Sequence, residues 1–98
     1  MDRPRIYVDF NDMVNENVVL LSKEDTILDS AGNNIVLKEG LYVSIYSDDI
    51  DENNVMDNLV AEGTVIQVDL TNYYPSWQHV KWCCRISENG IKHDSDLI

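Results

Sequence analysis

The sequence predicts a small all-β protein, built as an SH3-like barrel or sandwich of about six short strands. Three observations lead to this fold class. Apolar and polar residues alternate in several short segments, Gly, Asn and Pro separate those segments, and no segment has the periodicity of an amphipathic helix of about ten residues or more. At 98 residues the chain suits one hydrophobic core, so we expect a single domain over residues 1–98.

The first half of the chain contains three predicted strands and one ambiguous segment. Residues 5–10 alternate as a half-buried strand does: Ile6, Val8 and Phe10 form one face, and Arg5, Tyr7 and Asp9 form the other. Short apolar runs predict strands over residues 18–21 and 35–37, the second after a Gly-Asn-Asn turn. Residues 26–29 fit either a strand or one helical turn, so we expect at most one helical turn near residues 25–31.

The second half alternates more clearly. Residues 41–47 and 63–70 are predicted strands, and Thr64, Ile66 and Val68 share a face of the latter. An acidic loop over residues 48–58 separates these strands, and a Pro-containing loop over residues 71–76 follows them. Residues 80–86 form the last predicted strand. Its buried face carries Val80, Trp82, Cys84 and Ile86, and its outer face carries His79, Lys81, Cys83 and Arg85.

The charge of the chain is strongly acidic and unevenly distributed. With 7 Lys and Arg against 18 Asp and Glu, the net charge is −11, which repels phosphate backbones and anionic lipids. We therefore expect no direct binding to nucleic acid or membranes. Eight acidic and no basic residues lie between Lys38 and Lys81, so we expect these carboxylates to repel one another and gain little from basic neighbours.

The sequence favours a cytoplasmic location. The apolar run at residues 6–8 is much shorter than the roughly 7–15 residues of a signal peptide. No segment approaches the roughly 20 apolar residues of a membrane-spanning helix. The two cysteines, Cys83 and Cys84, are adjacent and cannot join distant parts of the chain by a disulfide, so we expect free thiols.

Three segments of the chain resemble small bacterial proteins of uncharacterised activity. They are IYVDFN at residues 6–11, LKEGLYVSIYSDD at residues 37–49 and WQHVKWCCRI at residues 77–86. The resemblance covers most of the chain. It implies no residue roles, because no activity is known for that group.

Metal sites are disfavoured by the spacing of the candidate ligands. His79, Cys83, Cys84 and His93 have the right chemistry for zinc, but they lack the usual paired-cysteine spacing. Asp49, Asp51 and Asn53 match the first ligands of a calcium loop. Asn54 and Val60 stand where such a loop requires Gly and Glu, so an ordinary solvated acidic loop is the favoured interpretation.

Catalytic motifs are equally weak. Cys83 shares its predicted face with Lys81 and Arg85, whose charges would favour a thiolate, but no orienting acid or Gly-rich elbow accompanies it. We therefore predict no catalytic residue, no metal and no cofactor.

Two features offer side chains suited to binding a partner. One is the acidic loop, and the other is the set of tyrosines and the tryptophan that lie near this loop or in the later loop. Such rings either form a groove for a partner or pack over the end of a barrel. The predicted partner-binding residues are Tyr42, Tyr46, Asp48, Asp49, Asp51, Glu52, Tyr73, Tyr74 and Trp77.

These residues predict a non-catalytic module that binds a basic protein or peptide. The alternatives are an acidic decoy that occupies the cationic groove of a nucleic-acid-binding protein, and an enzyme that uses Cys83 or a metal. The sequence makes no prediction of oligomeric state.

Overall fold

The computed structural model describes residues 3–50, 53–54 and 56–97, which consist almost entirely of strands and turns. Their nine strands are β1 (Ile6–Tyr7), β2 (Met13–Asn15), β3 (Val18–Ser22), β4 (Thr26–Leu28), β5 (Asn34–Val36), β6 (Tyr42–Ser47), β7 (Leu59–Ile66), β8 (Trp82–Ile86) and β9 (Lys92–His93). The 3₁₀ helices η1 (Pro75–Trp77) and η2 (Asp94–Leu97) complete the described elements. The predicted all-β fold class is confirmed. In these residues no helix has the length and apolarity to cross a bilayer.

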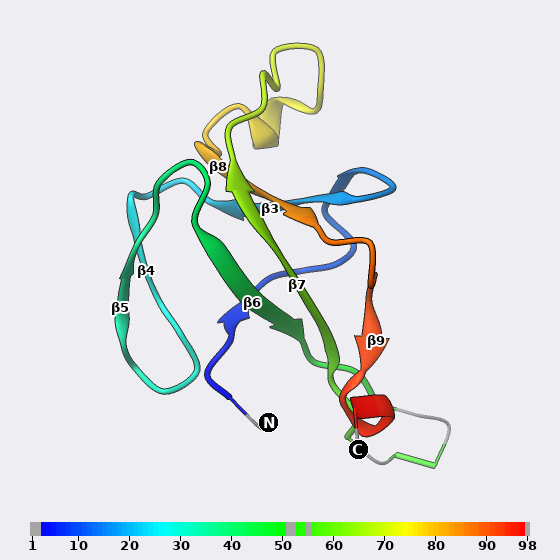
Figure 1. Cartoon of the computed structure of the whole chain (residues 1–98). Helices are drawn as coiled ribbons and strands as arrows, with labels where there is room; N and C mark the ends of the chain where they lie inside the picture. Colours follow the sequence, from blue (N-terminus) through cyan, green and yellow to red (C-terminus); the bar gives the residue numbers. More distant parts are fainter. Residues whose placement is uncertain (1–2, 51–52, 55, 98) are drawn as a thin grey trace.

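Seven of the described strands form one curled sheet, a half-barrel (Figure 1). Its order is β1-β6-β7-β8-β3-β2, and β9 pairs with the start of β7. β1 lies parallel to β6, whereas the other neighbours are antiparallel. Register shifts interrupt the pairing of β3 with both β2 and β8, and such irregularities bend a sheet and increase its twist.

The remaining two strands, β4 and β5, form a separate hairpin beside the half-barrel. The segment that the sequence left open between strand and helical turn is therefore a strand. Asp29 shapes the turn of this hairpin, because its Oδ1 accepts hydrogen bonds from the backbone N–H groups of Ala31 and Asn33. Gly32 supplies the left-handed backbone there, with φ of 82°.

Two contacts fasten the hairpin to the rest of the molecule. The indole Nε1 of Trp82 donates to Asp25 Oδ1 at 3.0 Å, and Lys81 Nζ lies 2.7 Å from the same oxygen. At the other end of the hairpin, the Ser30 N–H donates to the carbonyl of Arg5, and the Arg5 N–H donates to Ser30 Oγ. Ile27 and Ile35 pack against the main core from the inner face of the hairpin.

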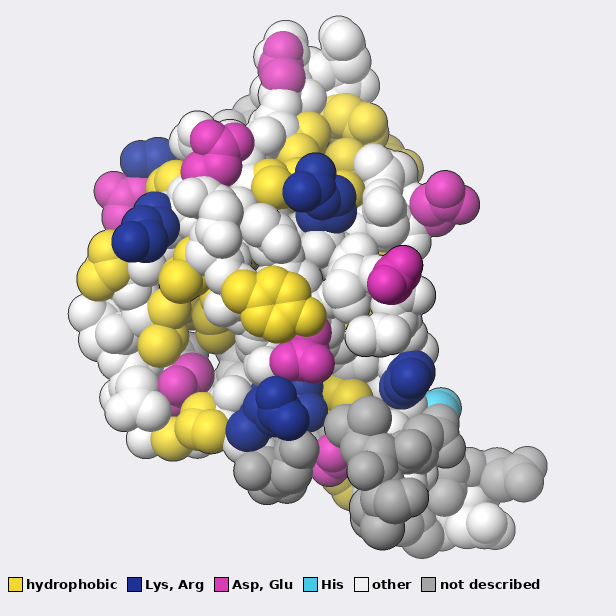
Figure 2. Space-filling model, in the orientation of Figure 1, with side chains coloured by type: hydrophobic (Ala, Val, Ile, Leu, Met, Phe, Trp, Pro, Cys, Tyr) yellow, Lys and Arg dark blue, Asp and Glu magenta, His cyan; other side chains and the backbone are white. Residues whose placement is uncertain are grey.

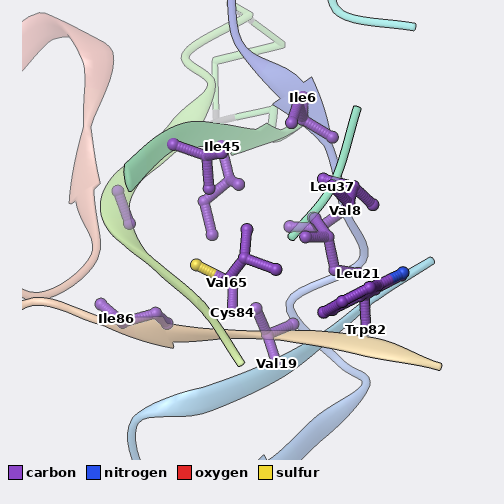
Figure 3. Close-up of a cluster of buried hydrophobic side chains, with 12 residues drawn as sticks. Ile6, Val8, Val19, Leu21, Leu37, Ile45, Val65, Trp82, Cys84 and Ile86 are labelled. Atoms are coloured by element: carbon purple, nitrogen blue, oxygen red, sulfur yellow. The ribbon is translucent and has the colours of Figure 1, made fainter. Parts of the chain in front are cut away.

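The main core fills the concave side of the half-barrel (Figure 3). The alternating residues of β1, β6, β7 and β8 point into it, as the period of two predicts. Its buried members are Ile6, Val8, Val19, Leu21, Leu37, Val43, Ile45, Ala61, Val65, Trp82, Cys84 and Ile86. The predicted inward face of the last strand is thus confirmed for Trp82, Cys84 and Ile86, while Val80 is half-buried in a second cluster.

The second cluster lies on the opposite side of β8. Cys83, which we expected to face outward, is only 1% exposed and packs there with Val18 and Leu70. The segment after β7 brings Leu70, Val68 and Trp77 onto this side of the sheet, so β8 is covered on both faces. His79, Lys81 and Arg85 are exposed, as expected.

Two further expectations need correction. Arg5, placed on the outer face of the first strand by its alternation, is only 3% exposed; the hairpin turn at Ser30 hydrogen-bonds to its backbone, and Arg5 lines a hollow together with Ala61 and Glu62. The strand predicted over residues 63–70 starts earlier and ends earlier, since β7 spans Leu59–Ile66. Thr64 and Ile66 share its half-buried face, as predicted, whereas Val68 lies beyond its end.

Candidate functional site

The tyrosines and the tryptophan of the loop between β7 and β8 form one ring cluster. The ring of Tyr73 stacks on Trp77 with centroids 6.0 Å apart, and the ring of Tyr74 meets Trp77 edge to face at 5.0 Å. Trp77 is half-buried and packs into the second core cluster, whereas Tyr73 and Tyr74 are 42% and 66% exposed. Of the two interpretations left open by the sequence, packing applies to Trp77, whereas the rings of Tyr73 and Tyr74 face solvent.

The loop that carries these rings is held by its own hydrogen bonds. Pro75 begins η1, where its missing N–H costs nothing, and the Trp77 N–H donates to the Tyr74 carbonyl at 2.9 Å. The Gln78 side-chain amide donates to the carbonyls of Leu70 and Tyr73 across the loop. Gln78 is therefore a positioning residue that the sequence pattern did not single out.

The rings border a hollow of about 490 Å³ between this loop and β2. We call it the aromatic hollow, and its lining residues are Met13, Val14, Asn72, Tyr73, Tyr74, Pro75 and Trp77. Its size lies within the range of roughly 300–1,000 Å³ that is usual for ligand sites. Its floor from β2 was not predicted, because the Asn-rich residues around Met13 gave no strand signal.

A second hollow of about 400 Å³ lies on the other side of η1. We call it the acidic hollow, because Asp9 and Asp12 contribute carboxylates to its wall, together with the basic side chain of Lys23 and the imidazole of His79. Ser76 of η1 lines this hollow, and its neighbours Pro75 and Trp77 line the aromatic one. The two hollows therefore adjoin each other across η1.

The acidic loop lies far from this cluster. It precedes β7 and the ring-bearing loop follows β7, so the two loops are at opposite ends of that strand (Figure 1). The strand has 8 residues, which at about 3.3 Å per residue places its ends roughly 23 Å apart. The predicted site thus divides into two regions that one short ligand segment cannot bridge. Asp51 and Glu52, which belong to the predicted set, lie outside the described residues.

The described part of the acidic loop packs against the C-terminal segment. Ser95 Oγ donates to Asp57 Oδ2 at 2.8 Å, and His93 Nδ1 lies 3.6 Å from Asp57 and 3.8 Å from Asp49. The hydrogen bonds from the Ser95 hydroxyl and N–H, together with the nearby His93, lower the pKa of Asp57. Asp48 is exposed and Asp49 is half-buried.

One carboxylate of the acidic stretch, Glu62, does have a basic neighbour, which comes from the N-terminal end of the chain. Arg3 Nη1 lies 3.2 Å from Glu62 Oε2, which also accepts a hydrogen bond from Ser44. Figure 2 shows acidic side chains spread over several parts of the visible face, with Lys and Arg side chains among them. The folded chain therefore disperses a charge that is concentrated in the sequence.

Tyr42 and Tyr46, the remaining predicted residues, lie on the outer face of β6, away from the ring cluster. Tyr42 is exposed, and it lines a small crevice of about 210 Å³ between β6 and the β4–β5 hairpin. Tyr46 is half-buried, and its ring meets Tyr7 edge to face at 5.5 Å. We therefore assign neither tyrosine to the site at η1, and only Tyr46 to local packing.

Both cysteines are buried thiols. Burial raises the pKa of Cys83 to about 11, and burial together with the adjacent Cys83 raises that of Cys84 to about 12. Since the thiolate is the nucleophile and the metal ligand, neither residue is suited to covalent chemistry at neutral pH. Among the residues that the structure describes, no group of three or more His, Cys, Asp and Glu side chains is arranged to hold a metal ion.

The chain matches no protein-family model, no curated protein and no solved structure. The functional assignment therefore rests on the geometry around η1.

Proposed function

We propose that this protein is a non-catalytic binding module that holds a basic protein or peptide partner across η1. The observation that carries the proposal is the pair of exposed rings, Tyr73 and Tyr74, which both contact the ring of the anchored Trp77. Rigid aromatic side chains with a polar tip provide much contact area at little cost in conformational entropy, and they are enriched in binding interfaces.

The charge around η1 supports a basic partner. Asp9 and Asp12 line the acidic hollow beside the rings and outnumber its one lysine, Lys23, and the chain carries a net charge of −11 that attracts cations from a distance. A segment with one apolar or aromatic side chain and a neighbouring Lys or Arg would fill both hollows. The partner should therefore present an extended basic segment that carries one apolar or aromatic side chain.

Two features support a non-catalytic role in a reducing compartment. Burial of Cys83 and Cys84 removes the thiols that the sequence offered as nucleophiles. Free, unpaired cysteines are usual in the cytoplasm, where we place the protein.

The aromatic part of the proposal is tested with a library of extended peptides that combine Arg or Lys with Pro and aromatic residues. For a peptide that binds the parent, we expect Tyr74→Ala to weaken binding by roughly 30-fold, about 2 kcal/mol, mainly through faster dissociation. Tyr42→Ala is the matched control, since it removes a similarly exposed ring from β6 and should leave binding unchanged. Surface plasmon resonance provides both rate constants.

The charge part is tested with the same peptide. The double substitution Asp9→Asn and Asp12→Asn should slow association and reduce its salt dependence, because charges at the rim of an interface act mainly on encounter. The double substitution Asp48→Asn and Asp49→Asn removes the same charge at the far end of β7 and is the control. If the control has the larger effect, or if Tyr74→Ala binds like the parent, the site does not lie at η1.

A further inference from the structure

The outer edge of the β4–β5 hairpin is open to a further strand. β5 pairs with β4 on one side and runs along the outer side of the molecule on the other (Figure 1). The Leu37 N–H donates to the Asp25 carbonyl, and the Asp29 N–H donates to the Asn33 carbonyl. Backbone groups alternate in direction along an antiparallel strand, so those of Asn34 and Val36 point away from β4 and toward the open edge.

The exposed face of the hairpin is apolar at two positions. Leu28 is 62% exposed and Val36 is 63% exposed, and they lie diagonally across the β4–β5 pair, because Thr26 is opposite Val36 and Leu28 is opposite Asn34. Diagonal neighbours in a sheet are close enough for side-chain contact. The edge therefore combines available backbone groups with an adjoining apolar surface.

The open edge of the hairpin is protected by its short length of three residues, and not by side chains that prevent pairing. Natural edges carry Lys, Pro or bulges that prevent pairing, and residues 26–37 contain neither Lys nor Pro. Asp29 is the one charged residue among them, and its carboxylate accepts hydrogen bonds within the turn from Ala31 and Asn33. In a chain with a net charge of −11, this segment lets a second copy approach without bringing like charges into direct contact.

We propose that two copies of this chain associate through β5, in antiparallel orientation, so that their hairpins form one four-stranded sheet. The backbone N–H and C=O groups of Asn34 and Val36 that point to the open edge fix the register. Asn34 lies opposite Val36 of the second copy, and the two Ile35 residues face each other at the twofold axis. Each Asn34–Val36 pair exchanges two backbone hydrogen bonds. On the exposed face, the two Val36 side chains become diagonal neighbours and join the two Leu28 side chains in one apolar row.

The association is weak and depends on salt in a characteristic way. A sheet edge this short buries less than the roughly 1,200 Å² of stable complexes, so the dimer forms with rising concentration. Because both copies carry −11, salt screens their long-range repulsion and strengthens the dimer. Binding of a basic partner at η1 weakens with salt, so this inference is independent of the proposed function and the two can fail separately.

Sedimentation analysis of the full chain tests the proposal, from about 10 μM to about 1 mM protein at low and at moderate salt. Val36→Pro removes the N–H that points to the open edge and keeps the hydrogen bonds to β4, because Pro is tolerated where the strand N–H faces outward. We expect dimerisation to weaken at least tenfold. Val36→Ile, the matched control, keeps both the N–H and a branched apolar side chain and should dimerise at least as well as the parent.

Hydrogen exchange of the unmodified protein provides a second readout that needs no substitution. As concentration rises, the amides of Asn34 and Val36 should become protected, whereas that of Ile35, which faces β4, should be protected at every concentration. A parent chain that stays monomeric at about 1 mM in moderate salt would overturn the proposal. So would a dimer in which Val36→Pro has no effect or in which the Asn34 and Val36 amides stay unprotected.

Discussion

Gly63 and Cys84 show how closely β7 and β8 approach each other. Gly63 lies opposite Ile86 in the β7–β8 pair, and a Cβ atom at that position would be 2.3 Å from the Arg85 carbonyl oxygen and 2.7 Å from Cys84 Sγ. Real Cβ atoms do not come so near, so Gly is required there for steric reasons. The same close packing buries Cys84 completely and keeps its thiol neutral.

Gly63→Ala should therefore destabilise the fold by about 3 kcal/mol, the upper part of the range for overpacked cores. The added methyl group meets backbone atoms of Arg85, which cannot move away as a flexible side chain can. Urea unfolding measures the change in the free energy of unfolding. Thr64→Ala, on the half-buried face of the same strand, is the control and should cost much less; equal losses in the two variants would show that β7 and β8 are not packed this tightly.

At the scale of elements, the β4–β5 hairpin depends on Asp25 for its attachment to β8. Hydrogen bonds from Lys81 and Trp82 lower the pKa of the Asp25 carboxyl below its ordinary value of 3.8. A carboxyl whose pKa is lower in the folded than in the unfolded state stabilises the fold above the unfolded value. This stabilisation is lost as the pH falls through the folded value.

Asp25→Asn should consequently lower the melting temperature at neutral pH, and the difference from the parent should shrink below about pH 3.8 as the parent carboxyl becomes protonated. Melting curves at several pH values measure it. Asp48→Asn removes the same charge from an exposed loop position and serves as the control. If the gap between Asp25→Asn and the parent is the same at neutral and acidic pH, the carboxylate does not anchor the hairpin.

The strands also show which parts of the fold could be predicted from patterns in the sequence. Alternation identified β6 and β8, because each buries one face in the main core, and a short apolar run identified β3. It missed β2 and β9, which are three and two residues long and too short to show a period. It misjudged Cys83, since a period of two assumes one solvated face and the loop that carries Trp77 covers the second face of β8.

At the scale of the whole molecule, the net charge of −11 opposes the compact state. Individual contacts offset part of this repulsion. Arg3 pairs with Glu62 and Lys81 pairs with Asp25, so these basic residues reach acidic residues that are far away in the sequence. Exposed pairs of this kind contribute little each, and most of the excess negative charge remains.

The melting temperature should therefore rise between low and moderate sodium chloride, as the Debye length falls from about 30 Å at 0.01 M to about 10 Å at 0.1 M. Screening weakens repulsion among the many unpaired carboxylates more than it weakens the few close ion pairs. Calorimetry at a protein concentration low enough to exclude dimers isolates this effect. A melting temperature that stays flat or drops over this range would show that long-range repulsion does not limit stability.

Composition and alternation by themselves determined that this protein is acidic, nearly all β and built around the inward residues of its longer strands, since these properties follow from local period and total charge. The tertiary structure alone decided which functional groups meet. In the folded chain Asp9 and Asp12 lie beside a ring cluster that is more than sixty residues away in the sequence. The acidic loop lies at the opposite end of β7 from this cluster. The physical reason is that strand pairing and loop packing bring together distant residues, whereas a periodic pattern reports only which side of its own strand a residue occupies.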